Sequence, residues 1–424
     1  MVDNSLYCAM SCVNMVRELN RRRVLGGIAA GGGLALAGCL DGNGAAEDAD
    51  AMVGTLSPTT GDLGDLGGPI EDAAVLPGTQ LEDEGSDFVI DIRSEDTETD
   101  PEAGITAAQS LVDAGYPSIT GAAASNVTIA VAEDIFIPDE VVAISPASTS
   151  PAITDMNGDF LLRTAPSDAL QGDVMASIAY EEEGLETMST FFLNDDYGQG
   201  LSDAAVENFE ELGGEVFEEV AFEPEQPSYD SELETALGDD PDLLIVVGFP
   251  DSGEQIFRDY YDNFDGDHTI MVPDGLQENS LPGNVDNPME NVMGTAPGAD
   301  GPESDAFVEL FEDEYGTAPG VFNAQAYDAT AVHILAQLSA DDATGAALSE
   351  QVRAVSDPGG EVVGPSNLAD AVEMAADGEE LEYQGASGLV QFDDNGDVTA
   401  ATYDVFEFDM DGYTVTQTIE FEAE

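Results

Sequence analysis

Lysine and tryptophan are missing from this 424-residue sequence, and histidine occurs only twice. All eight basic residues are arginine, and they face 89 aspartates and glutamates. Four of the arginines lie within the first 23 residues, so the rest of the chain has almost no positive charge. Binding to a nucleic acid needs a track of basic residues along the phosphates. Nucleic acid is therefore excluded as a partner.

Reactive side chains are almost as scarce. The three cysteines are Cys8, Cys12 and Cys39, so the sequence beyond residue 39 contains no thiol for a disulfide, a metal or a nucleophile. His268 follows a turn-like stretch and His333 lies in a helical run, and we interpret both as structural. The sequence has no metal-ligand spacing, phosphate-binding loop or nucleophile–base motif. We expect no catalysis, no metal and no cofactor.

The formal net charge of −81 would strain any compact state by self-repulsion. The Debye length is about 10 Å at 0.1 M salt and about 3 Å at 1 M, so concentrated salt would screen this repulsion. Disorder is the other common meaning of high charge, but 42% of the residues are hydrophobic and apolar runs recur along the chain. DNA mimics and calcium stores concentrate their acids in blocks, whereas these acids are spread evenly. We predict a folded protein adapted to brine.

The first forty residues contain three ordered signals. Arg21, Arg22 and Arg23 precede an apolar run over 24–37, which is too short to span a bilayer. The run ends in Leu-Ala-Gly-Cys at Cys39. The arginines resemble a twin-arginine export signal, and the last four residues resemble a lipoprotein cleavage box. We expect a signal peptide over 1–38, a lipidated Cys39 and an acidic tether over 39–50, with Met15 rather than Met1 as the initiator.

Short apolar runs alternate with helical patterns from residue 51 onward. The runs predict strands over 52–56, 88–92, 118–120, 141–145, 190–193, 243–248 and 269–272. Apolar spacing predicts helices over 106–114, 168–182, 201–212 and 253–263. This alternation predicts an α/β fold with parallel sheets covered by helices on both faces.

The C-terminal segment differs from this pattern. Residues 390–398 predict two short strands around an Asn-Gly turn, and residues 403–408 and 413–418 predict an antiparallel hairpin. Asp393, Asn395 and Asp397 also match the start of a calcium loop, but Val398 stands where that loop needs glycine. We interpret the segment as a hairpin turn.

Small hydroxyl and acidic residues follow several predicted strands. Ligands of open α/β sheets bind beyond the carboxyl ends of strands. Hydroxyls and free backbone N–H groups there suit a carboxylate, and an acidic side chain suits an ammonium. The alternative is that each of these residues only caps the helix that follows it.

The order of these segments resembles the Leu/Ile/Val-binding family of solute-binding proteins, which serve ABC transporters. The matching stretches, which span about residues 51 to 410, are GTLSP at 54–58, ISPASTSP at 144–151, LRTAPSD at 162–168, NDDYGQG at 194–200, YDA at 327–329 and FDDNGD at 392–397. The resemblance implies two Rossmann-like lobes with parallel sheets, joined by three crossings and closing on a ligand. It places 51–166 plus 298–384 in the first lobe and 167–297 plus 385–424 in the second.

The resemblance also implies which residues form the ligand pocket. Ser125, Ser148 and Thr149 match positions that hold the ligand's α-carboxylate. Asp274 matches the acidic residue that takes the α-ammonium. Tyr197 and Phe249 match aromatic positions that close over the ligand, and Leu63 matches a position in the first lobe. Phe249 lacks the hydroxyl that many amino-acid binders place there, and Leu63 replaces a residue that is often aromatic.

The implied function is that of an extracellular, lipid-anchored, monomeric substrate-binding protein of an ABC importer. It would bind a small amino acid with an aliphatic side chain and deliver it to the membrane permease. Two alternatives stay open: a binder of urea, an amide or another small solute, and a ligand-sensing ectodomain of a signalling system. An extracellular hydrolase is disfavoured because no nucleophile–base pair is found.

Overall fold

The computed structural model describes residues 49–422, apart from residues 157, 265, 267 and 343. The predicted signal peptide, its arginines Arg21, Arg22 and Arg23, Cys39 and most of the tether lie outside the described residues. Within the described part of the chain, no helix is both long and apolar enough to cross a membrane.

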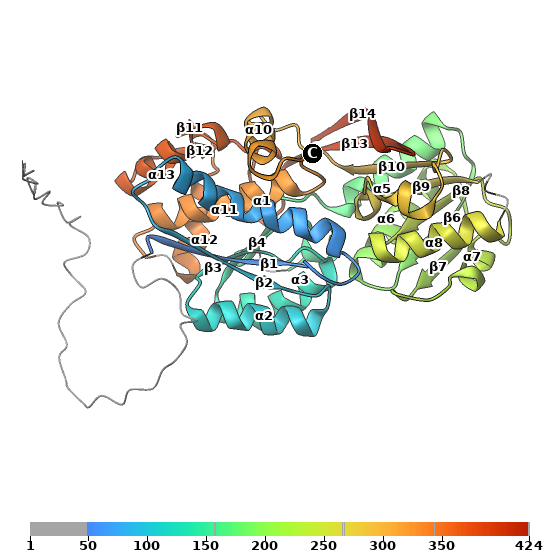
Figure 1. The fold of residues 1–424 in the computed structure, drawn as a ribbon, viewed down its shortest axis with the longest axis horizontal. Helices are drawn as coiled ribbons and strands as arrows, with labels where there is room; N and C mark the ends of the chain where they lie inside the picture. Colours follow the sequence, from blue (N-terminus) through green and yellow to red (C-terminus); the bar gives the residue numbers. More distant parts are fainter. Residues whose placement is uncertain (1–48, 157, 265, 267, 343, 423–424) are drawn as a thin grey trace, which may run out of the picture. The chain divides into compact units, whose positions relative to one another are not determined.

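The first of two large sheets has five parallel strands in the order β2–β1–β3–β4–β5 (Figure 1). These are β1 (Ala51–Ser57), β2 (Ile90–Asp96), β3 (Ser118–Gly121), β4 (Val142–Ser145) and β5 (Leu161–Arg163). Figure 1 shows α1 and α11 on one face of this sheet and α2 on the other. The sheet and the helices around it form the first lobe.

The longer helices of the first lobe come from two distant parts of the chain. They are α1 (Gly64–Asp83), α2 (Pro101–Ala114), α3 (Ser125–Val131), α10 (Ser304–Tyr315), α11 (Asn323–Ser339), α12 (Gly345–Ala354) and α13 (Leu368–Asp377). Its short elements are η2 (Ala132–Phe136), α4 (Ile137–Asp139), η3 (Pro151–Ile153), η6 (Pro365–Asn367) and the two-stranded sheet of β11 (Glu361–Val363) and β12 (Leu381–Tyr383). Helix α11 is buried on all sides from Asn323 to Leu338, because it packs between the sheet and helices α1, α12 and α13.

The second sheet has seven strands in the order β14–β13–β10–β9–β8–β6–β7. They are β6 (Thr187–Leu193), β7 (Glu215–Phe222), β8 (Leu243–Val247), β9 (Thr269–Val272), β10 (Val292–Pro297), β13 (Ala400–Asp409) and β14 (Gly412–Glu422). The five strands from β10 to β7 are parallel, while β13 runs antiparallel to both of its neighbours. This sheet and its helices form the second lobe.

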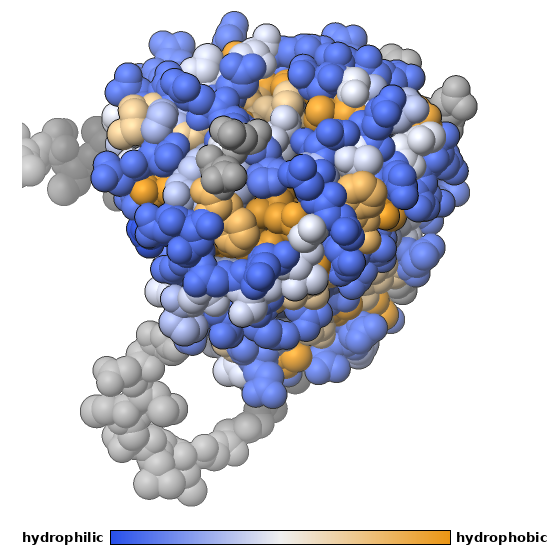
Figure 2. Space-filling model, turned by 90° about the vertical axis from the view of Figure 1, so that its right-hand side faces the viewer, coloured by the Kyte–Doolittle hydropathy of each residue, from blue (hydrophilic) through white to orange (hydrophobic). Residues whose placement is uncertain are grey.

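The helices of the second lobe mostly connect successive strands. They are α5 (Asp168–Ser177) with η4 (Ile178–Glu182), α6 (Asp196–Leu212), α7 (Asp230–Ala236), α8 (Pro250–Asn263), η5 (Asp274–Leu276) and α9 (Leu281–Val285). All five residues of β8 are buried, as expected for a parallel strand covered on both faces. On the face of the molecule that Figure 2 presents, hydrophilic residues predominate and apolar residues form scattered patches.

The chain passes between the two lobes three times. It leaves the first lobe after β5, returns after β10 and leaves again after β12 to form the β13–β14 hairpin. The predicted α/β fold with two parallel-sheet lobes is therefore confirmed. The residue boundaries assigned to the lobes stay a prediction.

The sequence prediction lacks both strands of the small β11–β12 sheet and three strands of the two large sheets, the latter each for a local reason. Strand β5 has only three residues, and β7 is an edge strand with many exposed acids and no continuous apolar run. Strand β10 contains Gly294, where a Cβ would lie 2.2 Å from the Phe406 ring. The strand predicted over 88–92 instead begins at Ile90 and continues to Asp96.

The C-terminal hairpin of β13 and β14 is confirmed, but the two strands predicted within 390–398 are wrong. That segment forms a single bridge between Phe392 and Val398. Its turn packs on β5 instead, because the Arg163 backbone N–H donates to the Gly396 carbonyl oxygen at 3.0 Å.

Candidate functional site

A cavity lies between the two lobes, where strands of both sheets end. It encloses about 310 Å³ not filled by protein atoms, part of it open to solvent. The first lobe contributes Leu63, Leu66, Ile70, Ala123, Ala124, Ser125, Ala147 and Phe322, and the second contributes Tyr197, Phe249, Asp274 and Gly275.

The polar and aromatic wall residues follow the carboxyl ends of parallel strands. Ser125 begins α3 after β3, Tyr197 lies in the first turn of α6 after β6, and Phe249 is the N-cap residue of α8 after β8. Asp274 begins the short helix η5 after β9. Ligands of open α/β sheets bind at this edge. The cavity is thus where the topology predicts a ligand.

The second-lobe wall is built from two stacked rings and a carboxylate. Tyr197 and Phe249 are parallel, with ring centroids 5.3 Å apart and an interplanar angle of 2°. The Tyr197 hydroxyl donates to Asp274 Oδ2 and accepts from the Gly275 backbone N–H, each at 3.3 Å. The ring is therefore fixed, and it holds Asp274 in place.

Asp274 keeps one acceptor open. Within the described residues its Oδ1 is buried and has no hydrogen-bond partner. Burial raises the pKa of Asp274 to about 6, although the hydrogen bond from the Tyr197 hydroxyl acts to lower it. A buried carboxylate oxygen without a donor suits an ammonium group, because a charge-assisted hydrogen bond would offset its desolvation.

A second buried carboxylate, Asp168, lies near Asp274. Its Oδ2 accepts a 2.9 Å hydrogen bond from the Thr149 hydroxyl. Burial raises the pKa of Asp168 well above its ordinary value, and the negative charge of Asp274 raises it further. Two neighbouring buried carboxylates are rarely both ionised, because each negative charge disfavours the other. We therefore take Asp168 as the member of the pair that retains its proton.

The opposite wall of the cavity is apolar. Leu63 precedes helix α1, and Leu66 and Ile70 lie within it at helical spacing, so all three face the same side. Phe322 joins them from the residue before α11, in the left-handed conformation at φ 64°. This wall offers no hydrogen bonds and suits an aliphatic or aromatic group.

The structure brings five of the seven predicted pocket residues together: Leu63, Ser125, Tyr197, Phe249 and Asp274. Ser148 and Thr149 do not line the cavity. The Ser148 hydroxyl lies 2.9 Å from the Ala123 carbonyl oxygen and 2.6 Å from the Thr128 hydroxyl, and Thr149 donates to Asp168. Both side chains serve the packing of the loop after β4, and a role in holding a ligand carboxylate stays a prediction.

Sequence reasoning missed Leu66, Ile70 and Phe322. The spacing of Leu63, Leu66 and Ile70 is the signal that could have found the first two. The unusual backbone of Phe322 leaves no trace in the sequence.

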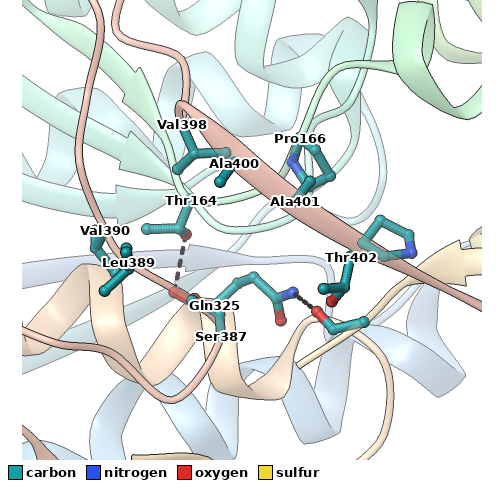
Figure 3. Close-up of a pocket in the computed structure, with 13 residues that line it drawn as sticks. Thr164, Pro166, Gln325, Ser387, Leu389, Val390, Val398, Ala400, Ala401 and Thr402 are labelled. Atoms are coloured by element: carbon teal, nitrogen blue, oxygen red, sulfur yellow. Dashed lines mark hydrogen bonds between the residues drawn. The ribbon is translucent and has the colours of Figure 1, made fainter. Parts of the chain in front are cut away.

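A second cavity of about 300 Å³ lies among the three crossings (Figure 3). It is lined by Thr164, Pro166, Pro297, Gly298, Gln325, Ser387, Gly388, Leu389, Val390, Val398, Ala400, Ala401 and Thr402. The Thr164 hydroxyl donates to the Gln325 carbonyl oxygen at 2.9 Å, and Gln325 Nε2 donates to the Gly298 carbonyl oxygen at 3.1 Å. These bonds tie the first and second crossings to α11.

Two α/β lobes linked by three crossings, with a cavity between facing strand ends, define a two-lobed solute-binding protein. The chain belongs to the periplasmic binding protein family, whose model matches residues 51–409. This is a family of binding proteins rather than enzymes.

Individual relatives agree with this assignment. The chemotactic signal transduction system substrate-binding protein BasB of Halobacterium salinarum is 27% identical over 315 residues, which cover 73% of this chain and 72% of the relative. The structure of a leucine-binding protein from Thermotoga maritima superposes with a TM-score of 0.72 at 22% identity and covers 87% of this chain and 98% of that one. A branched-chain amino acid transporter substrate-binding protein from Streptococcus pneumoniae, in complex with isoleucine, also gives 0.72 at 17% identity, covering 88% and 99%. At these identities the two structures establish the fold alone.

Proposed function

We propose that this chain is the extracellular solute receptor of an ABC importer and binds an amino acid with an aliphatic side chain. The observation that carries the proposal is the open Oδ1 of buried Asp274 opposite the apolar wall of Leu63, Leu66 and Ile70. An aliphatic amino acid carries one cation and one apolar side chain on the same carbon. It would meet both walls at once when the lobes close.

The ligand's carboxylate needs donors, and the first lobe offers them at the start of α3. Ser125 lines the cavity, and its hydroxyl accepts from the Ser150 backbone N–H at 3.2 Å. That hydroxyl therefore has its own hydrogen free to donate to a carboxylate. The N-terminus of α3 adds backbone N–H groups and the favourable end of a helix dipole.

The test is a ligand panel in multi-molar salt, read by thermal shift and confirmed by calorimetry. Leucine, isoleucine and valine should raise the melting temperature, since ligand at 100 times Kd stabilises the native state by about 2.7 kcal/mol. Isocaproate lacks the ammonium and isoamylamine lacks the carboxylate, so both should bind far more weakly than leucine. Absence of any response to amino acids would reject the ligand assignment, and a response to urea or acetamide alone would replace it.

A sensing role is the second candidate, because BasB is named for chemotactic signal transduction. The same closed form would then dock on a transducer instead of a permease. Deleting the gene should abolish chemotaxis toward the ligand but leave its uptake intact if sensing is the role. Loss of uptake with intact chemotaxis supports the importer.

The proposal includes the cellular location of the protein. We infer that Arg21–Arg23 direct export and that Cys39 carries the lipid anchor. The receptor would then be a monomer held at the extracellular face of the cell membrane. Replacing Cys39 with serine should release the protein into the medium, as followed by cell fractionation. Retention of the serine variant in the membrane fraction would exclude the anchor.

A further inference from the structure

Asp62 is a first-lobe residue whose carboxylate is bound in the second lobe. It lies between β1 and α1, and it accepts a 2.9 Å hydrogen bond from the backbone N–H of Ser252 in α8. The Ser252 hydroxyl lies 2.8 Å from Asp62 Oδ1 and 3.0 Å from Oδ2, so it donates as well. Only 6% of Asp62 and 1% of Ser252 is exposed.

Helix α8 needs this partner because its own N-cap residue is Phe249, whose side chain has no cap acceptor. The first backbone N–H groups of a helix have no partner within the helix. Pro250 has no N–H, and Ser252 is the third helical residue, whose N–H is the usual target of an N-cap side chain. Asp62 therefore supplies from the other lobe the cap that the sequence of α8 lacks.

The pair also borders the ligand cavity. Leu63, the next residue after Asp62, lines the first-lobe wall, and Phe249, at the start of α8, lines the second-lobe wall. Helices α1 and α8 are in contact. Any motion that separates the two walls would also separate Asp62 from Ser252.

We propose that the Asp62–Ser252 pair is a latch between the lobes, formed as they close, and that Asp62 thereby sets ligand affinity. The proposal rests on the ligand-binding role of the cavity. With the lobes apart, α8 loses its cap and Asp62 returns to water. Part of the free energy of closure then comes from this bond and not from the ligand.

The latch is linked to protons. Burial raises the pKa of Asp62 from 3.8 to about 6, against the lowering effect of the Ser252 hydrogen bonds. The negative charges of Asp251 on α8 and Glu225 before α7 raise the pKa of Asp62 further. Asp62 also interacts electrostatically with Asp195 at the start of α6 and with Tyr229 before α7. Asp65 on α1 faces Asp251. None of these groups is basic. Closure therefore takes up a proton between about pH 4 and 6, and falling pH favours the latched form.

Four proteins test the latch by ligand affinity: wild type, Asp62→Ala, Asp62→Asn and, as a matched control, Asp83→Asn, which removes an exposed charge from the far end of α1. Ligand affinity is measured at pH 5 and pH 7 with the amino acid that the panel identifies. Asp62→Ala should weaken binding about tenfold, the usual effect of losing a helix cap. Asp83→Asn should leave affinity unchanged.

The Asp62→Asn variant separates the effect of the capping hydrogen bond from the effect of proton uptake. Its amide oxygen can still accept from Ser252, but the side chain carries no charge and does not titrate. Relative to Asp62→Asn, wild type should gain on the order of tenfold in affinity from pH 7 to pH 5. Asp274 titrates in the same range and acts in the opposite direction, but it is common to both proteins and cancels in the comparison. Equal pH profiles for the two proteins would overturn the proton linkage.

Hydrogen exchange of the full chain, followed by mass spectrometry, reads the latch without a ligand. The N-terminal turn of α8 should exchange faster in Asp62→Ala than in wild type, and Ser252→Ala added to it should change little further. If wild type binds no amino acid but this difference persists, the proposed function fails and the latch stands. Identical exchange and identical affinity in wild type and Asp62→Ala would overturn the latch.

Discussion

Arg163 Nε donates a 2.6 Å hydrogen bond to Asp397 Oδ1, joining the last strand of the first sheet to the turn that leads into the third crossing. The guanidinium is fully buried. Its Nη1 also donates to the Ser150 carbonyl oxygen at 2.9 Å, and Nη2 donates to the Thr154 hydroxyl at 2.8 Å. Arg353 holds the same turn through the Asp393 carbonyl oxygen. Two of the four arginines beyond residue 23 therefore fix the turn before the third crossing.

Replacing Asp397 with alanine should destabilise the protein by about 3–5 kcal/mol, because it leaves a buried arginine without its counter-charge. Glu254→Gln is the control, since it removes the carboxylate paired with the partly exposed Arg258 and should cost about 0–1 kcal/mol. Urea unfolding in high salt measures both. A similar midpoint shift for the two variants would show that the Arg163 pair contributes little.

Helix α1 carries Leu66 and Ile70 of the cavity wall, but the sequence did not predict it as a helix. It contains Pro69 and Pro77, and Gly67 and Gly78 interrupt its pattern, so spacing did not predict it as a helix. Those glycines permit close packing, because a Cβ at Gly67 would lie 1.9 Å from the Pro58 carbonyl oxygen and one at Gly78 would lie 2.7 Å from Ile92. Tertiary contacts override local propensity here, whereas the buried strand β8 is visible directly in its apolar run.

In the site, too, some features could be predicted from the sequence and others could not. Strand-end position and family resemblance located Asp274, Tyr197 and Phe249, because topology fixes where strands end. They could not say which way the Ser148 and Thr149 side chains point, since that depends on neighbours such as Thr128 and Asp168. The pairing of Asp62 with Ser252 joins residues 190 positions apart, and no local pattern in the sequence indicates it.

Asp274→Asn should weaken binding of the amino acid by at least about 30-fold, because one partner of a desolvated charge pair is lost. Asp196→Asn is a matched control, because it removes an exposed charge beside Tyr197. Calorimetry at pH 7 measures both. Retained affinity in the Asp274 variant would remove this residue from the ammonium site.

The ammonium contact should also make ligand affinity depend on pH. Burial raises the pKa of Asp274 to about 6 and a bound ammonium would lower it, so binding releases protons near that pH. In the Asp62→Asn background, where the latch does not titrate, affinity should fall as the pH drops below about 6. An affinity that rises there would contradict this assignment of the charge.

His333 should make stability fall in acid. It is buried in α11, its Nε2 donates to the Ile119 carbonyl oxygen at 3.0 Å, and Nδ1 has no partner within the described residues. Burial lowers the pKa of His333 from 6.5 to about 3. The contribution of the neutral side chain to folding stability is therefore complete above pH 6.5 and is lost as the pH falls from 6.5 toward 3. At pH 4.5 the loss is about 3 kcal/mol.

The variant His333→Gln isolates this contribution, because its amide can still donate to Ile119 but does not titrate. Asp328, whose pKa burial raises to about 6, acts in the opposite sense and loses its contribution as the pH rises through 6. It is present in both proteins and cancels in their difference. The stability of wild type relative to the variant should therefore decline from pH 7 to pH 4.5, and a constant difference would show that His333 does not titrate on unfolding.

Dilution of salt should lower the melting temperature steeply. The chain carries 89 acids against eight arginines, so attraction between opposite charges cannot offset repulsion among the acids. Above about 1 M salt the Debye length is about 3 Å, shorter than the spacing of most surface charges, and at 0.1 M it reaches about 10 Å. Melting followed in potassium chloride and in equimolar tetramethylammonium chloride separates screening from specific cation binding, because both screen alike but only the small cation fits between carboxylates. Equal stabilisation by the two salts supports screening, and a melting temperature independent of either salt would contradict adaptation to brine.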